Sequence, residues 1–305
     1  MDEQKVPLLL DTDIGSDIDD AVCLAYLLRQ PRCEMLGITT VTGEPQKRAM
    51  LADMICRAAG RTDIPIHSGS GKQLFGRQLQ LMATQAEVLD GHSHRTDFEP
   101  YTAVEFLRKT IRERPGEITL LTIGALTNIA LLFALDPEIP GMLKRLVMMC
   151  GVFTTQTPNS SWRECNAIID PIATSIVYQA TVPEHISIGL DVTLHCTMES
   201  NLCREKFKGE PLETVAKMAE VWFREVPRIT FHDPLAGAVI FDPEICKYQA
   251  GTVEVETDGT NCRGMTFWKP DTELKPHRIA LEVNADRFFE HYFSVTSALT
   301  ADHCE

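Results

Sequence analysis

The 305-residue sequence lacks three features that would direct it out of the cytoplasm. None of its ten cysteines forms a C-x-x-C pair, which favours reduced thiols over a disulfide framework or a zinc site. No apolar run is long enough to span a membrane. The first five residues contain neither the basic nor the apolar region of a signal peptide. We therefore expect a cytoplasmic protein with no membrane partner.

Positive charge is also scarce. The chain carries 29 Lys and Arg against 43 Asp and Glu, a formal net charge of -14. Such a surface repels phosphate backbones and anionic lipid headgroups. The charge balance therefore argues against nucleic acid or an anionic membrane as the main partner.

Negative charge, by contrast, is concentrated in one short stretch. Five aspartates fall within ten residues, at Asp11, Asp13, Asp17, Asp19 and Asp20. Capping of a following helix would explain one or two of them. Burying an ionised carboxylate is costly unless it is paired or bound to a metal. Five converging carboxylates therefore predict a cation site, and hard oxygen ligands suit calcium or magnesium.

The pattern of the whole chain predicts how this stretch is positioned. Residues 6–10 form a continuous apolar run, typical of a strand buried on both faces of a parallel sheet. Strands and helices alternate through most of the sequence, and period-two segments follow residue 243. We predict an α/β fold with a doubly wound, mostly parallel central sheet, helices on both faces and small antiparallel additions near the C-terminus. No repeat or linker marks a boundary, so residues 1–305 are predicted to form a single Rossmann-like domain.

Polar residues follow several of the predicted strands. In a doubly wound sheet, ligands bind outside the carboxyl ends of the strands, so we expect these residues to meet at one edge. Two of them, Glu164 and Asn166, would point the same way on an extended segment. Residues 69–96 are predicted to form a long loop, and such loops often carry function.

Five motifs then resemble, in order, those of the inosine-uridine nucleoside hydrolase family. They lie between about residue 6 and residue 240. They are Asp11-Thr12-Asp13-Ile14-Gly15 with Asp19-Asp20-Ala21, Leu36-Gly37-Ile38-Thr39-Thr40-Val41, Gly124-Ala125-Leu126-Thr127-Asn128-Ile129-Ala130, Glu164-Cys165-Asn166 with Asp170-Pro171, and His232-Asp233-Pro234-Leu235-Ala236.

The resemblance implies calcium-dependent hydrolysis of the N-glycosidic bond of ribonucleosides, giving free base and ribose. It assigns the calcium ligands to the side chains of Asp13, Asp20 and Asp233 and to the backbone carbonyl of Ile123. It also makes Asp13 the base that takes a proton from the metal-bound water, which then attacks the anomeric carbon. His232 lies where some members place the acid that protonates the leaving base.

The same resemblance assigns the ribose contacts and the partners. The ribose residues are Asp19, Glu164, Asn166, Asn159 and Glu44. N-glycosidic cleavage passes through an oxocarbenium-like state, which surrounding carboxylates stabilise. The implied partners are a nucleoside substrate and further copies of the chain, in a homodimer or homotetramer.

The sequence departs from the family pattern at several positions. The aspartate cluster is two residues longer than usual, and an alignment without this insertion would put Ile18 at a ligand position. We therefore assign Asp19 and Asp20, which leaves Asp17 as either a helix cap or an additional ribose contact. Glu44 stands where many members have asparagine, and Asn159 is out of register with the family asparagine.

Alternatives remain open at this point. Asp11-Thr12-Asp13 also resembles the nucleophile motif of magnesium-dependent haloacid-dehalogenase-type phosphatases, although Gly15 stands where that chemistry needs threonine. A nucleoside- or ribose-binding protein without turnover is the non-enzymatic alternative. Asp233 has a second explanation as a helix cap, and Asn128 is expected to cap its own helix.

Overall fold

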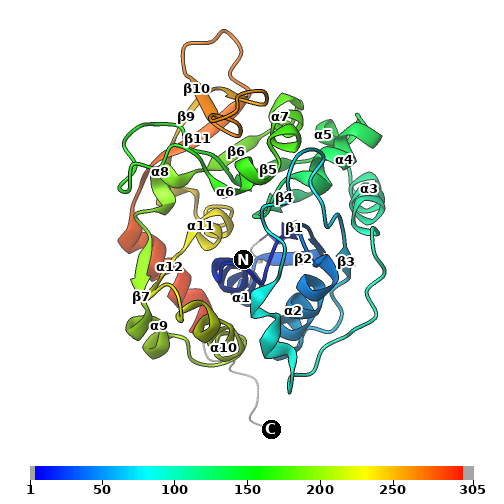
Figure 1. The fold of residues 1–305 in the computed structure, drawn as a ribbon, viewed down its shortest axis with the longest axis vertical. Helices are drawn as coiled ribbons and strands as arrows, with labels where there is room; N and C mark the ends of the chain where they lie inside the picture. Colours follow the sequence, from blue (N-terminus) through cyan, green and yellow to red (C-terminus); the bar gives the residue numbers. More distant parts are fainter. Residues whose placement is uncertain (1–3, 298–305) are drawn as a thin grey trace.

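The centre of the fold is a nine-stranded sheet, seen here in a computed structural model that describes residues 4–297 (Figure 1). The strand order is β10-β9-β11-β6-β5-β4-β1-β2-β3. The strands are β1 Val6–Thr12, β2 Cys33–Thr40, β3 Ile66–Ser68, β4 Thr119–Thr122, β5 Arg145–Met149, β6 His185–Ile188, β9 Cys246–Val255, β10 Thr266–Lys269 and β11 His277–Val283.

Neighbouring strands from β3 to β11 all pair in parallel, whereas β9 pairs antiparallel with both β11 and β10. The predicted fold class is therefore confirmed, including the antiparallel additions near the C-terminus. A separate antiparallel pair, β7 Thr197–Glu199 and β8 Arg228–Thr230, was not predicted. Each of these strands has only three residues, too few to show a period-two pattern.

Helices cover both faces of the sheet (Figure 1). One face carries α1 Asp19–Arg29, α2 Pro45–Ala58, α10 Leu212–Trp222, α11 His232–Ala238 and α12 Ala285–Thr296, and the other carries α3 Ala103–Glu113, α4 Thr127–Leu135, α5 Ile139–Met142 and α7 Pro171–Gln179. Shorter elements are η1 Thr84–Leu89, α6 Cys165–Ile169, α8 Leu190–Thr193, α9 Ser200–Lys206 and η2 Pro243–Ile245. Within the described residues, every helix is too short or too polar to cross a lipid bilayer.

The apolar run of β1 explains why this strand is central. Leu8, Leu9 and Leu10 are fully buried, with Leu9 in the core of one face and its two neighbours in the core of the other. The chain leaves β1 toward α1 on one face and leaves β4, its neighbour, toward α4 on the opposite face. A crevice opens at such a switch point, outside the carboxyl ends of the strands. The aspartate stretch begins at this point.

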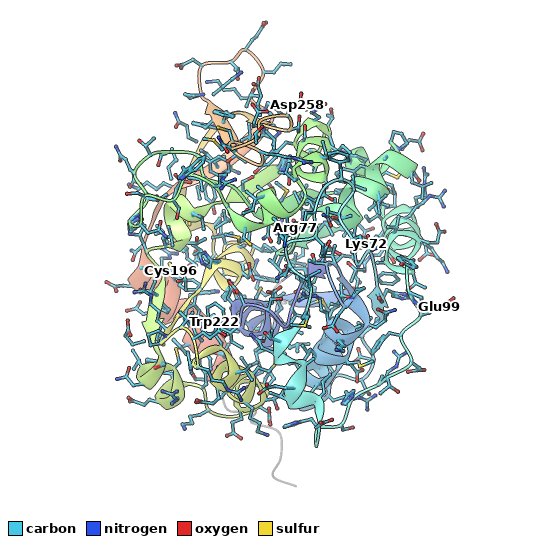
Figure 2. All side chains as sticks on the ribbon, in the orientation of Figure 1. Lys72, Arg77, Glu99, Cys196, Trp222 and Asp258 are labelled. Atoms are coloured by element: carbon cyan, nitrogen blue, oxygen red, sulfur yellow. The ribbon has the colours of Figure 1, made fainter. Side chains whose placement is uncertain are left out.

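The long loop between β3 and α3 crosses the molecule. Figure 2 places Lys72 and Arg77 near the middle of the view and Glu99 at its edge. Its only helical segment between residues 69 and 102 is the short η1. Its residues 80–85 contact the loop after β1, which brings this segment to the crevice.

Candidate functional site

A cavity of about 340 Å³ opens at the carboxyl edge of the sheet. Its lining combines residues from the first twenty positions with residues from beyond position 230, and it is strongly acidic. The lining residues are Asp13, Asp17, Asp19, Asp20, Gln80, Ile123, Met149, Asn159, Arg163, Glu164, Cys165, Asn166, Ile168, Leu190, Leu194, His232 and Asp233.

The loop after β1 places Asp13 in this cavity. Asp13 is only 5% exposed, and its carboxylate lies against the backbone of the β4–α4 turn. A Cβ on Gly124 would lie 2.8 Å from both the amide nitrogen and Oδ1 of Asp13, so this turn tolerates no side chain. The Thr12 hydroxyl donates to Asp20 and accepts from the Ile14 amide at 3.1 Å, which shapes the loop from within.

Two helix N-termini bring three more carboxylates together. Asp19 and Asp20 lie in the first turn of α1, and Asp233 lies in the first turn of α11, which packs against α1. One oxygen from each of these three side chains lies within 4.8 Å of the others. The Asp233 amide donates to Asp19 Oδ2 at 3.2 Å, while no side chain caps α11. Asp233 is therefore not a helix cap, and its carboxylate faces the other acids.

Burial raises the pKa of every aspartate in this group, and repulsion between carboxylates adds to the rise at Asp17, Asp19, Asp20 and Asp233. Desolvation is the main cause at Asp13, Asp20 and Asp233, whose pKa values all lie above the usual range. Desolvation, with repulsion from neighbouring aspartates, raises the pKa of Asp17 to about 6 and that of Asp19 to about 8. Clustered buried carboxylates are stable in their charged form only beside a cation. The oxygen-only ligand set fits a hard divalent ion.

Glu164 and Asn166 also line the cavity. The segment that carries them is not extended as expected, because Cys165 begins the short helix α6 and Glu164 is its N-cap. The Glu164 carboxylate accepts from the amides of Asn166 at 2.6 Å, Ala167 at 3.0 Å and Gly151 at 3.1 Å. These bonds lower its pKa, but desolvation outweighs them and raises it overall.

The Asn166 side chain ties this helix to the sheet. Its amide nitrogen donates to the backbone carbonyls of Ile123 at 2.9 Å and Met149 at 3.0 Å. The Ile123 carbonyl, predicted as a metal ligand, thus has one bond to Asn166 and lines the same cavity as the aspartates. A carbonyl oxygen has two lone pairs, so this bond leaves one free.

His232 lines the cavity next to Asp233. Its Nδ1 lies 2.7 Å from the hydroxyl of Thr193 in α8. Desolvation lowers the pKa of His232 to about 4, so the imidazole is neutral near pH 7. A neutral imidazole carries one N–H donor, and the Thr193 hydroxyl, which both donates and accepts, is compatible with either tautomer.

The structure brings together nearly all of the residues predicted for the site. Glu44 is the exception, because it lies outside the acidic cavity. Its carboxylate pairs with Lys47 Nζ at 2.5 Å and accepts from the Ala83 amide at 3.0 Å. The residues brought together are Asp13, Asp19, Asp20, Ile123, Asn159, Glu164, Asn166, His232 and Asp233, and Asp17 joins them.

Sequence reasoning missed two polar residues that line the cavity. Gln80 comes from the long loop, and its side chain partly offsets the rise that burial causes in the pKa of Asp13. Arg163, which packs against the Trp162 ring at 4.6 Å, is the only lysine or arginine among the lining residues. Both lie in segments without periodicity, where the sequence offers no signal of which side chain faces inward.

Comparisons with known proteins agree with this arrangement. The sequence profile of the inosine-uridine preferring nucleoside hydrolase family matches residues 8–290. A probable uridine nucleosidase of Oryza sativa subsp. japonica is 30% identical, over 98% of this chain and 90% of its own length. A pyrimidine-specific ribonucleoside hydrolase of Escherichia coli is 32% identical, over 86% of this chain and 88% of its own length.

Solved structures share the fold. A plant nucleoside hydrolase superposes with a TM-score of 0.85 at 23% identity, over 96% of this chain and 99% of its own. A purine-preferring ribonucleoside hydrolase from Gardnerella vaginalis gives a TM-score of 0.83 at 23% identity, over 95% and 98%. The motif resemblance is thus confirmed, and the phosphatase alternative is not the family found. The chain belongs to the inosine-uridine preferring nucleoside hydrolase family and is a hydrolase that acts on N-glycosyl compounds.

Proposed function

We propose that this protein hydrolyses pyrimidine ribonucleosides, uridine foremost, in a calcium-dependent reaction that releases free base and ribose. The observation that carries the proposal is the group of buried aspartates with raised pKa values at the switch point of the sheet. The pyrimidine preference rests on the relatives at 30% and 32% identity, whose names specify uridine or pyrimidine substrates.

The proposed calcium site consists of the Asp13, Asp20 and Asp233 carboxylates and the Ile123 carbonyl. All four residues line the cavity, and Asp20 and Asp233 belong to the closest oxygen cluster. Asp19, the third member of that cluster, is either a ligand or the ribose contact that the sequence suggests. When bound, the ion supplies Lewis-acid activation of a water molecule and a fixed attachment point for the ribose diol.

Asp13 is the proposed general base. Its environment suits this role, because burial raises its affinity for a proton while Gln80 and the nearby Arg48 favour the ionised form. A base with a pKa raised toward the working pH accepts a proton from water more readily than an ordinary carboxylate does. The water then attacks the anomeric carbon as the bond to the base breaks.

Four polar residues of the cavity bind the sugar in this proposal. Glu164, Asn166, Asn159 and Asp19 are the hydrogen-bonding partners for the ribose hydroxyls. Positive charge develops on the sugar in the oxocarbenium-like state, and the surrounding carboxylates stabilise it. His232, neutral near pH 7, donates a hydrogen bond to the leaving base rather than acting as a preformed imidazolium.

Incubation with a nucleoside panel tests the proposal. We expect uridine to yield equal amounts of uracil and reducing sugar, and chelation by EGTA to stop the release until calcium is restored. Purine nucleosides turned over as fast as uridine would refute the substrate assignment. Tight uridine binding without release of uracil would instead identify the binding protein without turnover.

The Asp13→Asn variant tests the general base. Because the amide is nearly isosteric but cannot take a proton, we expect kcat to fall by about 10²- to 10⁴-fold. The melting temperature should stay close to that of the parent, because the neutral amide does not carry the cost of burying a charged carboxylate. Asp286→Asn, in the first turn of α12 and outside the cavity, is the matched control. Normal turnover by the Asp13 variant would refute the assignment.

The assembly and the location of the protein are part of the same proposal. We propose a cytoplasmic homodimer or homotetramer that binds neither nucleic acid nor membranes. Sedimentation of the purified protein, with and without calcium, measures its mass directly.

A further inference from the structure

A buried arginine lies directly behind the acidic cavity. Arg48, in the first turn of α2, has a fully buried side chain, and it is the largest such residue in the described chain. Burying a guanidinium costs several kcal/mol unless its donors and its charge are satisfied. No carboxylate among residues 4–297 forms an ion pair with it, so its donors are satisfied in another way.

Backbone oxygens take the place of a carboxylate. The Arg48 Nε donates to the Gly43 carbonyl at 2.8 Å, and Nη1 donates to the Asp13 carbonyl and to the Ile14 carbonyl at 3.0 Å. Nη2 donates to the Ser16 hydroxyl at 3.1 Å and to the Met82 carbonyl at 3.5 Å. One planar group thus joins three separate segments: residues 13–16, residue 43 and residue 82.

The segments that Arg48 joins also pack closely against each other. A Cβ on Gly43 would lie 2.3 Å from the Leu81 carbonyl oxygen and 2.5 Å from that of Gln80. The Gln85 amide donates to the Gly15 carbonyl at 2.9 Å, and its side chain donates to the Ser16 carbonyl at 2.9 Å. Residues 80–85 are therefore attached to the loop after β1 at several points, and Gln80 of this segment lines the cavity, even though the segment belongs to a long loop.

We propose that Arg48 is a positioning residue that holds the backbone of Asp13 and the Gln80–Met82 segment as one unit and sets the affinity of the aspartates for a divalent cation. Its hydrogen bonds fix the two peptide planes that follow Asp13, and so help to set the direction of that carboxylate. Gln80, whose side chain favours the ionised form of Asp13, lies two residues before the Met82 carbonyl that Arg48 contacts. The inference rests on the proposed function, because it concerns the same cation site.

Arginine is needed here because of its shape. Its fork presents five N–H donors in one plane, whereas lysine presents three donors from a single atom. A lysine at this position keeps the charge but cannot reach Gly43, Asp13 and Met82 together. Groups that orient metal ligands from behind contribute about 10- to 100-fold to metal affinity or activity. The Arg48→Lys change therefore separates the geometric contribution from the charge.

Calorimetric titration with CaCl2 tests this inference, and the melting temperature monitors the fold. We expect the Kd for calcium to rise by about 10- to 100-fold in Arg48→Met. In Arg48→Lys it should rise by less than in Arg48→Met but remain measurably above that of the parent. Guanidinium chloride at low millimolar concentration should partly restore calcium binding to Arg48→Ala, whereas NaCl should not. The uridine kcat should fall in parallel.

Arg145→Met is the matched control. Arg145 is half-buried and likewise donates to a hydroxyl and a backbone carbonyl, to Thr119 Oγ1 at 2.9 Å and to the Ile240 carbonyl at 3.3 Å, but it lies at the opposite end of the strands. The Arg145→Met substitution should lower the melting temperature and leave the Kd for calcium unchanged.

Three outcomes would overturn the inference. The first is an Arg48→Met variant that folds and binds calcium with the Kd of the parent. The second applies if Arg48→Met does not fold: it is an Arg48→Lys variant that folds and has the parent Kd. Failure of both to fold would leave Arg48 a purely structural residue. A parent protein that binds calcium but releases no uracil would refute the proposed function alone, while the Kd comparison would still judge Arg48.

Discussion

At the scale of single residues, the site depends on how closely backbone and carboxylates approach. Asp13 is held from behind by Arg48, from the side by Gln80 and from the front by the Gly124 turn. Each of these contacts comes from a different strand end or loop. The position of one carboxylate is therefore set by segments that are far apart in sequence.

Gly124→Ala should impair both turnover and stability. The added methyl group would lie 2.8 Å from the amide nitrogen and from Oδ1 of Asp13, so the backbone as well as the carboxylate must move. A displacement of about 1 Å in a reacting group costs about 10²-fold in rate, so we expect kcat for uridine to fall by about 10- to 100-fold. Steady-state kinetics and thermal unfolding measure the two effects. Gly141→Ala, which meets no atom within 4 Å, is the control.

Residues that could be predicted from the sequence are those in compact motifs. Asp19, Asp20, Asp233, Glu164 and Asn166 all line the cavity as expected. The exceptions depend on long-range contacts that a motif does not record. Glu44 pairs with Lys47 and residue 83 rather than facing the cavity.

Asn128 shows the same limit, because it does not cap its helix. Its amide donates to Asp11 Oδ1 at 2.8 Å and to the Thr40 carbonyl at 3.1 Å. Its side-chain oxygen accepts from the Ser70 amide at 2.9 Å. This residue therefore joins three strand ends, a role that becomes visible only once the strands are aligned.

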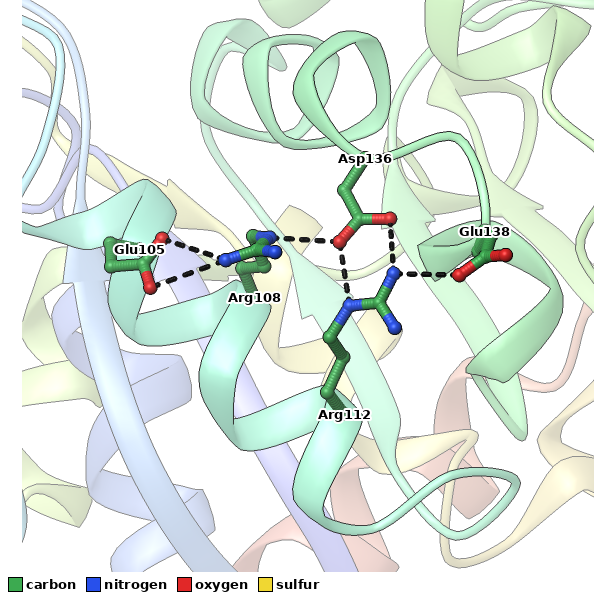
Figure 3. A network of polar contacts seen from close by, with 5 residues as sticks. All are labelled: Glu105, Arg108, Arg112, Asp136 and Glu138. Atoms are coloured by element: carbon green, nitrogen blue, oxygen red, sulfur yellow. Dashed lines mark hydrogen bonds and ion pairs between the residues drawn. The ribbon is translucent and has the colours of Figure 1, made fainter.

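At the scale of elements, ion pairs join helices on the face of the sheet away from α1. In Figure 3, Arg108 and Arg112 of α3 converge on Asp136, the residue that follows α4. Arg112 contacts both carboxylate oxygens at 2.7 Å, and Arg108 Nε lies 2.8 Å from Oδ2. Hydrogen bonds from Arg112 and Arg108 outweigh desolvation and lower the pKa of Asp136 to about 2.

The Asp136→Asn variant should be less stable than the parent at pH 7, and the difference should shrink on acidification. The folded pKa lies below the unfolded value of about 3.9. The stabilisation is therefore fully present above about pH 4 and is lost as the pH falls through about 2. Melting temperatures at pH 7, 5 and 3 measure the effect. If the difference in melting temperature between variant and parent stayed constant across this range, the prediction would be wrong. The control is Asp63→Asn, because Asp63 forms an exposed ion pair with Arg61.

Element types were predictable where the apolar pattern was long, and unpredictable where contacts decide. The strand β1 could be predicted from its continuous apolar run, and the strands near the C-terminus from their period-two pattern. The segment that carries Glu164 and Asn166, expected to be extended, instead begins the helix Cys165–Ile169, because the Glu164 carboxylate caps its first amides. The short β7 forms only because it pairs with β8, about thirty residues later in the sequence.

At the scale of the whole molecule, the acidic cavity makes folding and cation binding depend on pH together. The cavity aspartates have folded pKa values above their unfolded value of about 3.9. Their contribution to stability is therefore fully present below about pH 4 and is lost as the pH rises through about 6 to 8. A bound cation removes this loss, because it favours the ionised carboxylates.

Calcium should therefore stabilise the protein more at pH 8.5 than at pH 5.5. At the lower pH the ion must displace protons from the aspartates, so we expect its Kd to be at least about tenfold weaker there. Thermal shift with saturating CaCl2 against EGTA, in one buffer mixture at both pH values, measures the difference. Equal shifts at the two values would show that the aspartates are already ionised without the ion.

The cavity is built from two parts of the polypeptide that are synthesised at different times. Its acidic wall is shared between α1, which starts at Asp19, and α11, which carries Asp233. During synthesis the ribosome releases the first helix long before the second, so a nascent chain holds only part of the proposed ligand set. A product that stops before position 233 should therefore be inert toward nucleosides, because it lacks Asp233 and the three strands β9, β10 and β11.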